Sequence, residues 1–101
     1  MNNKLKIAIL TSLLLLSGCG SPPQVPRESR KLIESLRTAV SAHRTDWLDA
    51  NAKLVEQRYA KGELNEQQHE AFLSIITLAR AGNWSEAEQQ AIRLGKAQRG
   101  T

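Results

Sequence analysis

The stretch NEQQHEAFLSIITLA, residues 65–79, contains the strongest helix signal in the chain. Asn65 is followed three positions later by Gln68, which is the spacing of a capping box, where two side chains satisfy free N–H groups at a helix start. Four apolar residues then recur at helical spacing, namely Phe72, Ile75, Ile76 and Ala79. The stretch therefore predicts a helix with one apolar face, and that face needs other helices to cover it.

Two segments before this stretch also predict helices. The first runs from about Ser29 to His43 and carries Leu32, Leu36, Ala39, Val40 and His43 at helical spacing, with Ile33 widening this stripe. The second starts at Thr45 or Asp46, either of which can act as a cap. Its apolar face is expected to comprise Leu48, Val55 and Tyr59, with Trp47, Ala52 and Leu54 beside it. Gly62 is placed to end it, because glycine adopts a left-handed conformation without a Cβ penalty. We expect the first of these helices, which follows a Pro-rich segment, to pack loosely or against something other than the bundle.

A last helix is expected after Gly82. Ser85 and Glu88 have the spacing of a second capping box, and the inward face would comprise Ala87, Ala91 and Leu94. Short connections make successive helices antiparallel neighbours. The predicted fold class is therefore all-α, a small antiparallel bundle of about four helices over residues 27–97, followed by a tail at 98–101.

The first residues have the layout of an export signal. Lys4 and Lys6 precede an apolar run from Ile7 to Leu16. A run of about ten residues is too short to cross a bilayer core of roughly 30 Å as a stable helix. Cys19, the single cysteine of the chain, follows directly and has no partner for an internal disulfide.

The quartet Leu16, Ser17, Gly18 and Cys19 resembles the lipobox of bacterial lipoproteins, the sequence recognised by their signal peptidase. The resemblance implies cleavage before Cys19, a diacylglycerol on its thiol and acylation of the new amino group. Gly20 stands where an aspartate would imply retention in the inner membrane, so the family pattern implies the periplasmic face of the outer membrane in a host with two membranes. We therefore expect a signal peptide at 1–18, a flexible tether at 19–26, and no cofactor beyond the covalent lipid.

The charge of the chain argues against nucleic acid as a partner. Its 14 Lys and Arg fall to 12 when Lys4 and Lys6 leave with the signal, against 10 Asp and Glu, for a net charge of +2. A nucleic-acid surface needs clustered basic residues, and here the two signs are interspersed along the sequence. The expected partners are the membrane, through the lipid, and a protein of the cell envelope.

The sequence offers little to support catalysis. Glu66 and His69 have the Glu-x-x-His spacing of di-iron bundles, but those use two copies and this chain has one, so no metal site is predicted. No serine lies in a Gly-x-Ser-x-Gly elbow, and no catalytic residue is predicted. Trp47 and Tyr59 are the candidate partner-binding residues, because Trp and Tyr dominate interface hot spots. The alternative is that both belong to the core of the bundle.

Two further resemblances concern the helices. The turn AGN (81–83) followed by WSEA (84–87) is similar to one helical hairpin of a tetratricopeptide-type repeat, but a repeat array needs about three copies and one is present. Residues 47–94, with the turn GEL (62–64), resemble the helical domain shared by the steroid receptor RNA activator protein and the COPII coat scaffold C-terminus. That resemblance implies a binding module without catalysis. The alternative is a structural or stress-type lipoprotein without a specific partner.

Overall fold

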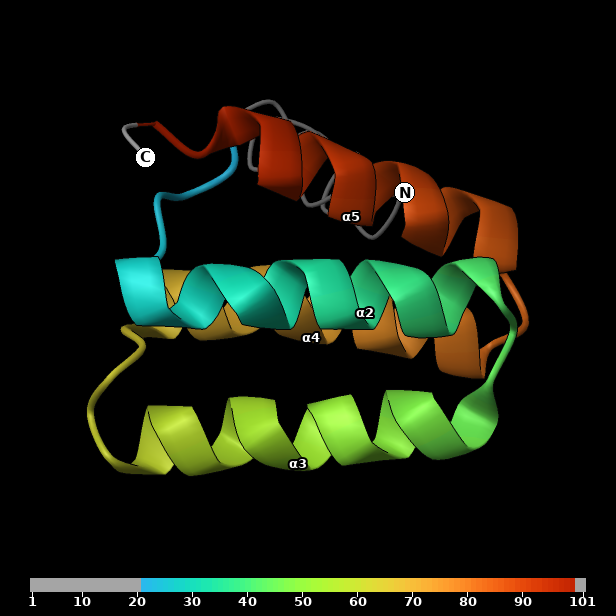
Figure 1. Cartoon of the computed structure of the whole chain (residues 1–101), viewed down its shortest axis with the longest axis horizontal. Helices are drawn as coiled ribbons and strands as arrows, with labels where there is room; N and C mark the ends of the chain where they lie inside the picture. The colour runs from blue at the N-terminus through green and yellow to red at the C-terminus, as the bar shows by residue number, and fades with distance from the viewer. Residues whose placement is uncertain (1–20, 100–101) are drawn as a thin grey trace, which may run out of the picture.

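The structure is a computed structural model that describes residues 21–99 (Figure 1). A short 3-10 turn, η1 (Arg27–Ser29), leads into four α-helices: α2 (Arg30–Ser41), α3 (Thr45–Ala60), α4 (Glu66–Arg80) and α5 (Trp84–Ala97). No strand occurs between residues 21 and 99. The predicted fold class, an all-α antiparallel bundle, is confirmed. The predicted signal peptide and Leu16, Ser17, Gly18 and Cys19 lie outside the described residues.

The four helices form a closed arrangement in which α2 and α4 each contact both α3 and α5. Successive helices run in opposite directions, and α3 and α5 lie on opposite sides of the central pair α2 and α4 (Figure 1). A surface on α3 and a surface on α5 therefore face away from each other.

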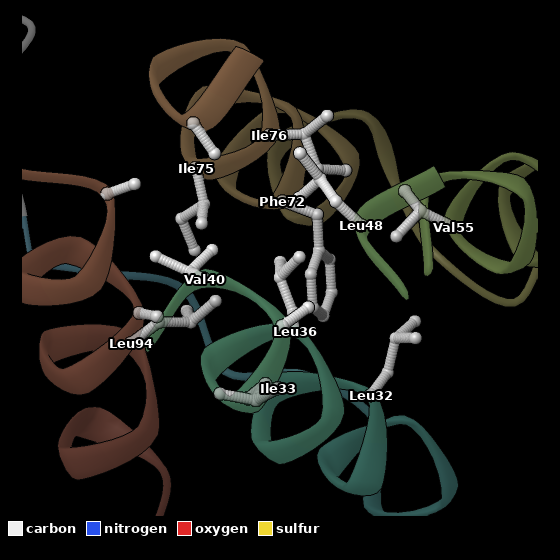
Figure 2. Close-up of a cluster of buried hydrophobic side chains, with 14 of the residues drawn as sticks. Leu32, Ile33, Leu36, Val40, Leu48, Val55, Phe72, Ile75, Ile76 and Leu94 are labelled. Atoms are coloured by element: carbon white, nitrogen blue, oxygen red, sulfur yellow. The ribbon is translucent and has the colours of Figure 1, made fainter. Parts of the chain in front are cut away.

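The core is built mainly around α2 and α4. Figure 2 shows the ring of Phe72 reaching from α4 toward Leu36 of α2, and both residues are fully buried. Helix α2 buries Leu32, Ile33, Leu36, Ala39 and Val40 of the predicted stripe, whereas His43, its last predicted member, is exposed and lies beyond the end of the helix. The expectation that this first helix packs loosely is wrong. Helix α2 contacts α3 on one side and α5 on the other, so it is packed between these two helices.

The helix ends on either side of α4 follow the predicted signals. The Gln68 N–H donates to Asn65 Oδ1 (2.8 Å) and the Asn65 N–H donates to Gln68 Oε1 (2.8 Å), so the predicted capping box is confirmed. Gly62, after α3, and Gly82, after α4, adopt φ values of 77° and 86°, the left-handed conformation expected of glycine at these ends.

Two other helix starts differ from the prediction. Helix α5 begins at Trp84, directly after the turn, so Ser85 and Glu88 already lie inside the helix and form no capping box. Neither Thr45 nor Asp46 caps α3, because the helix begins at Thr45 and Arg44 holds the N-cap position. The Asp46 carboxylate binds the Arg44 guanidinium instead.

A left-handed residue other than glycine joins α2 to α3. His43 has a φ of 54°, and its ring stacks on that of Trp84 with centroids 4.7 Å apart. A positive φ is unfavourable for most side chains but less so for histidine. The stacking places the start of α5 against the end of α2, and no local sequence signal predicts it.

Residues 21–26 of the Pro-rich segment form no helix or strand, and they are packed on the bundle. Val25 is buried, and its N–H donates to Gln98 Oε1 (2.8 Å). The Gln98 side chain also donates to the Pro23 carbonyl (3.0 Å), and the Arg99 N–H donates to Gln24 Oε1 (2.9 Å). These contacts join the predicted tether to the predicted tail, and they place the N-terminal end of the described chain beside the C-terminal end of α5.

Candidate functional site

All three of the exposed large hydrophobic residues in the described chain belong to α3. They are Trp47, Leu54 and Tyr59, which are 41%, 42% and 38% exposed. The same helix buries only two apolar residues, Leu48 and Val55. Exposed apolar residues that gather on one element mark an interaction surface more strongly than scattered ones. Helix α3 is therefore the candidate site.

Trp47 and Leu54 lie along one side of α3. They are seven residues apart, which is about two turns, so their side chains project within roughly 20° of each other around the helix axis. Leu54 is a functional candidate that the sequence-based selection of Trp47 and Tyr59 did not include. Its seven-residue spacing from Trp47 is the signal that points to it. We call Trp47 and Leu54 together the α3 patch.

An ion pair between Arg44 and Asp46 lies at one face of the Trp47 indole. The Arg44 guanidinium lies over the ring, with its central carbon 4.2 Å from the ring centroid, an arrangement that provides a cation–π contact. Two hydrogen bonds join that guanidinium to the Asp46 carboxylate, at 2.9 Å and 2.7 Å. The hydrogen bond from Arg44 lowers the pKa of Asp46 below its ordinary value, so the pair keeps its charge at neutral pH. The α3 patch thus ends in an aromatic ring that has a charged pair over one face.

Tyr59 belongs to a different surface from Trp47. Twelve residues separate the two, so Tyr59 lies about a third of a turn around α3, on the side that faces α4. Its ring stacks on that of His69 in α4, with centroids 3.8 Å apart and planes 3° apart. The structure thus exposes both predicted partner-binding residues but does not bring them into one patch.

His69 connects α4 to α3 rather than pairing with Glu66. Its Nε2 lies 2.7 Å from Glu56 Oε2, across the α3–α4 contact. Among residues 21–99, no group of three or more His, Cys, Asp or Glu side chains is placed to hold a metal ion. The stacked Tyr59 and the Glu56–His69 contact fix the orientation of α3 on the bundle.

A buried polar residue lies behind the α3 patch. Asn51 is 4% exposed, and its Nδ2 donates to the Trp47 carbonyl (2.8 Å). Its Oδ1 is buried without a hydrogen-bond partner within the described chain. An unsatisfied buried acceptor costs about 1–3 kcal/mol. Asn51 therefore weakens the attachment of α3 at the level of the patch.

Comparison with known proteins adds no relative. No protein-family profile, no curated protein and no solved structure matches the chain. Within residues 21–99, no helix has the length and apolar character needed to cross a membrane. The fold and the site define a class only, a small helical bundle that presents an apolar patch on one of its helices.

Proposed function

We propose that the protein is a small helical lipoprotein that is anchored in the cell envelope and binds another envelope protein through the α3 patch. One observation carries the proposal: the exposed large hydrophobic residues of the described chain all lie on α3, the helix opposite α5 (Figure 1). The proposed role is that of an adaptor or scaffold without catalysis.

The anchor rests on the resemblance of Leu16, Ser17, Gly18 and Cys19 to a lipobox. Two or more acyl chains give stable membrane attachment, whereas one gives only reversible binding. Since the chain enters the bundle beside the C-terminal end of α5, a lipid at Cys19 would hold the α5 side close to the membrane. The start of α3, which carries Trp47, lies at the other end of the bundle from this segment (Figure 1), so a protein partner could reach it away from the membrane.

The anchor has a direct test in the mass of the protein. Purified from membranes after expression of the full sequence, the chain should begin at Cys19 and carry the mass of the attached lipid. The Cys19→Ala variant should remain uncleaved and without lipid. Normal processing of that variant would overturn the proposed anchor.

The α3 patch is tested by photo-crosslinking in intact cells. A benzophenone side chain replaces Ala50, which is exposed and lies on the same side of α3 as Trp47 and Leu54. The control replaces Gln89, an exposed residue of α5. We expect one dominant protein adduct from position 50 and none from position 89.

The variant that decides the result is Trp47→Ala combined with Leu54→Ser. Truncating a hot-spot residue costs at least about 2 kcal/mol, which weakens binding roughly thirtyfold, so the adduct should disappear. Self-adducts alone, or an adduct that persists in the double variant, would contradict the proposal. Self-adducts would favour the alternative, a structural lipoprotein without a specific partner.

A further inference from the structure

A groove lies between α2 and α5. Its volume is about 620 Å³, and it is open to solvent. The floor is apolar and consists of Ile33, Ala91, Ile92 and Gly95. Gly95 opens the groove, because a Cβ at this position would lie 3.6 Å from Ile33 Cγ2 and would occupy part of the space.

The rim of the groove is basic. Arg30, Lys31 and Arg37 from α2 and Lys96 from α5 surround it, with Glu34 as the one acid in its lining. The net charge of the rim is therefore +3 (four bases against one acid). Within the described residues, Lys31, Arg37 and Lys96 take part in no salt bridge. Cations of one sign around a low-dielectric cleft raise the local concentration of anions.

The position of the groove relates it to the N-terminal end of the chain. Gln98 lines the groove and also donates to the Pro23 carbonyl. Cys19 lies four residues before Pro23 in the sequence (23 − 19). A fully extended chain of four residues spans roughly 14 Å at most. A membrane anchor at Cys19 would therefore bring the groove to the depth of the lipid headgroups.

We infer that this groove binds the phosphate groups of anionic phospholipids in the membrane that holds the anchor. Arg37, Lys31 and Lys96 contact the phosphates, and Ile33 and Ile92 contact the apolar part of the same lipid. The inference rests on the proposed anchor, because the anchor supplies the membrane. Its consequence is orientation: the groove fixes the α2–α5 side of the bundle on the lipid.

Charge complementarity and the nearby chain end select this occupant over an acidic peptide. Each Lys or Arg near an anionic membrane contributes roughly 1 kcal/mol. An acidic peptide would satisfy the same charges, but it has no reason to be concentrated at the end of the groove where the anchor segment leaves the bundle. Peptide binding is therefore an outcome that the test must separate.

The test uses the full sequence, expressed in bacteria, purified from membranes and placed in nanodiscs. One form carries a benzophenone side chain in place of Ile92, on the groove floor, and the control form carries it in place of Gln57, which is exposed on α3. The nanodiscs contain either phosphatidylcholine alone or phosphatidylcholine mixed with phosphatidylglycerol. Phospholipid adducts are measured by mass spectrometry.

We expect lipid adducts from position 92 in the anionic nanodiscs and few from neutral ones, with none from position 57. Arg37→Gln with Lys96→Gln should weaken the lipid contact roughly thirtyfold at low salt, from two charges at about 1 kcal/mol each. The matched control is Lys53→Gln with Arg93→Gln, exposed residues outside the groove lining, which removes the same charge and should leave the adduct yield unchanged.

Three results would overturn the inference. They are equal adduct yields in neutral and anionic nanodiscs, equal losses in the two double variants, and a protein adduct in place of lipid when cross-linking is repeated in cells. The mass of the purified chain keeps the two proposals apart. An acylated chain without lipid adducts at position 92 contradicts the groove alone, whereas a chain without acylation contradicts the anchor and the groove with it.

Discussion

Helices α2 and α3 are neighbours in the same bundle, yet they use their apolar residues in opposite ways. Helix α2 has 12 residues and buries five apolar side chains. Helix α3 has 16 residues and buries two, while it exposes Trp47, Leu54 and Tyr59. The difference shows that α2 maintains the fold and that α3 is available for other contacts.

Helix α3 is attached through few buried apolar side chains, and polar contacts at the surface add to them. Arg58 donates to the Ser29 hydroxyl of η1 (3.2 Å), and Arg80 of α4 pairs with Asp49 (3.1 Å). Exposed ion pairs contribute about 0–1 kcal/mol each, whereas burying one large apolar side chain contributes about 1.5–3 kcal/mol. The attachment of α3 is therefore weaker than that of α2, and α3 is the helix that a partner can reach without disturbing the core.

The largest expected effect comes from one substitution made in both helices, Leu36→Ala in α2 and Leu54→Ala in α3. Leu36 has no solvent exposure, and Leu54 is 42% exposed. Leu36→Ala should lower the free energy of unfolding by about 3–5 kcal/mol, through lost burial and the cavity left behind. Leu54→Ala should change it by less than about 0.5 kcal/mol. Denaturation by urea, followed by circular dichroism, measures both.

For partner binding, by contrast, we expect Leu54→Ala to have a direct effect. Leu54→Ala should reduce the photo-crosslink from position 50 while leaving the fold intact. If the two variants lose comparable stability, Leu54 belongs to the core and the contrast between α2 and α3 fails.

A smaller effect is expected where α3 is weakest. Asn51 is buried, and its Oδ1 has no partner among the described residues. Replacing both the unsatisfied acceptor and the donor by an apolar group of similar shape is neutral or stabilising, so Asn51→Leu should raise the free energy of unfolding by about 1 kcal/mol. It should also slow hydrogen exchange across α3. Asn51→Asp is the control, which should destabilise the protein because it buries a charge. A loss of stability in Asn51→Leu would show that the amide is better accommodated than its contacts indicate.

The contrast between the two helices also separates what was predictable from what was not. The spacing of Leu32, Leu36 and Val40 on a single stripe predicted the buried face of α2, because one stripe leaves one choice. The face predicted for α3 was Leu48, Val55 and Tyr59, of which Leu48 and Val55 are buried and Tyr59 is exposed. Helix α3 carries apolar residues on several sides, so its sequence leaves more than one choice of core face. That choice depends on where α2 and α4 lie.

Contacts between distant parts of the chain were the least predictable. The groove combines Arg37 of α2 with Lys96 of α5, and the N-terminal segment is fixed by Gln98, 73 residues after Val25. No local pattern connects such positions. The capping box at Asn65 and Gln68 was predictable, because both partners lie within one turn of the helix.

The smallest expected effect concerns the charged pair beside Trp47. The hydrogen bond from Arg44 lowers the pKa of Asp46 in the folded protein. The stability that the pair provides is therefore present above the unfolded-state pKa of aspartate, about 3.9, and is lost as the pH falls through the lower folded value. Both side chains are exposed, so the melting temperature should hardly change at neutral pH in Asp46→Asn. The sensitive measurement is the fluorescence of Trp47 in a Trp84→Phe background, which should titrate below about pH 4 in the parent and stay flat in Asp46→Asn.

An identical titration in Asp46→Asn would show that the pair does not control the Trp47 environment. A flat fluorescence response in Asp46→Asn would extend the contrast between α2 and α3. If Arg44 is held by Asp46 throughout the range above about pH 4, the ring of Trp47 keeps one orientation across that range. Helix α3 would then combine a weak attachment to the bundle with an ordered aromatic surface. A partner would gain from this combination, because the ring is already oriented when it binds and little side-chain entropy is lost.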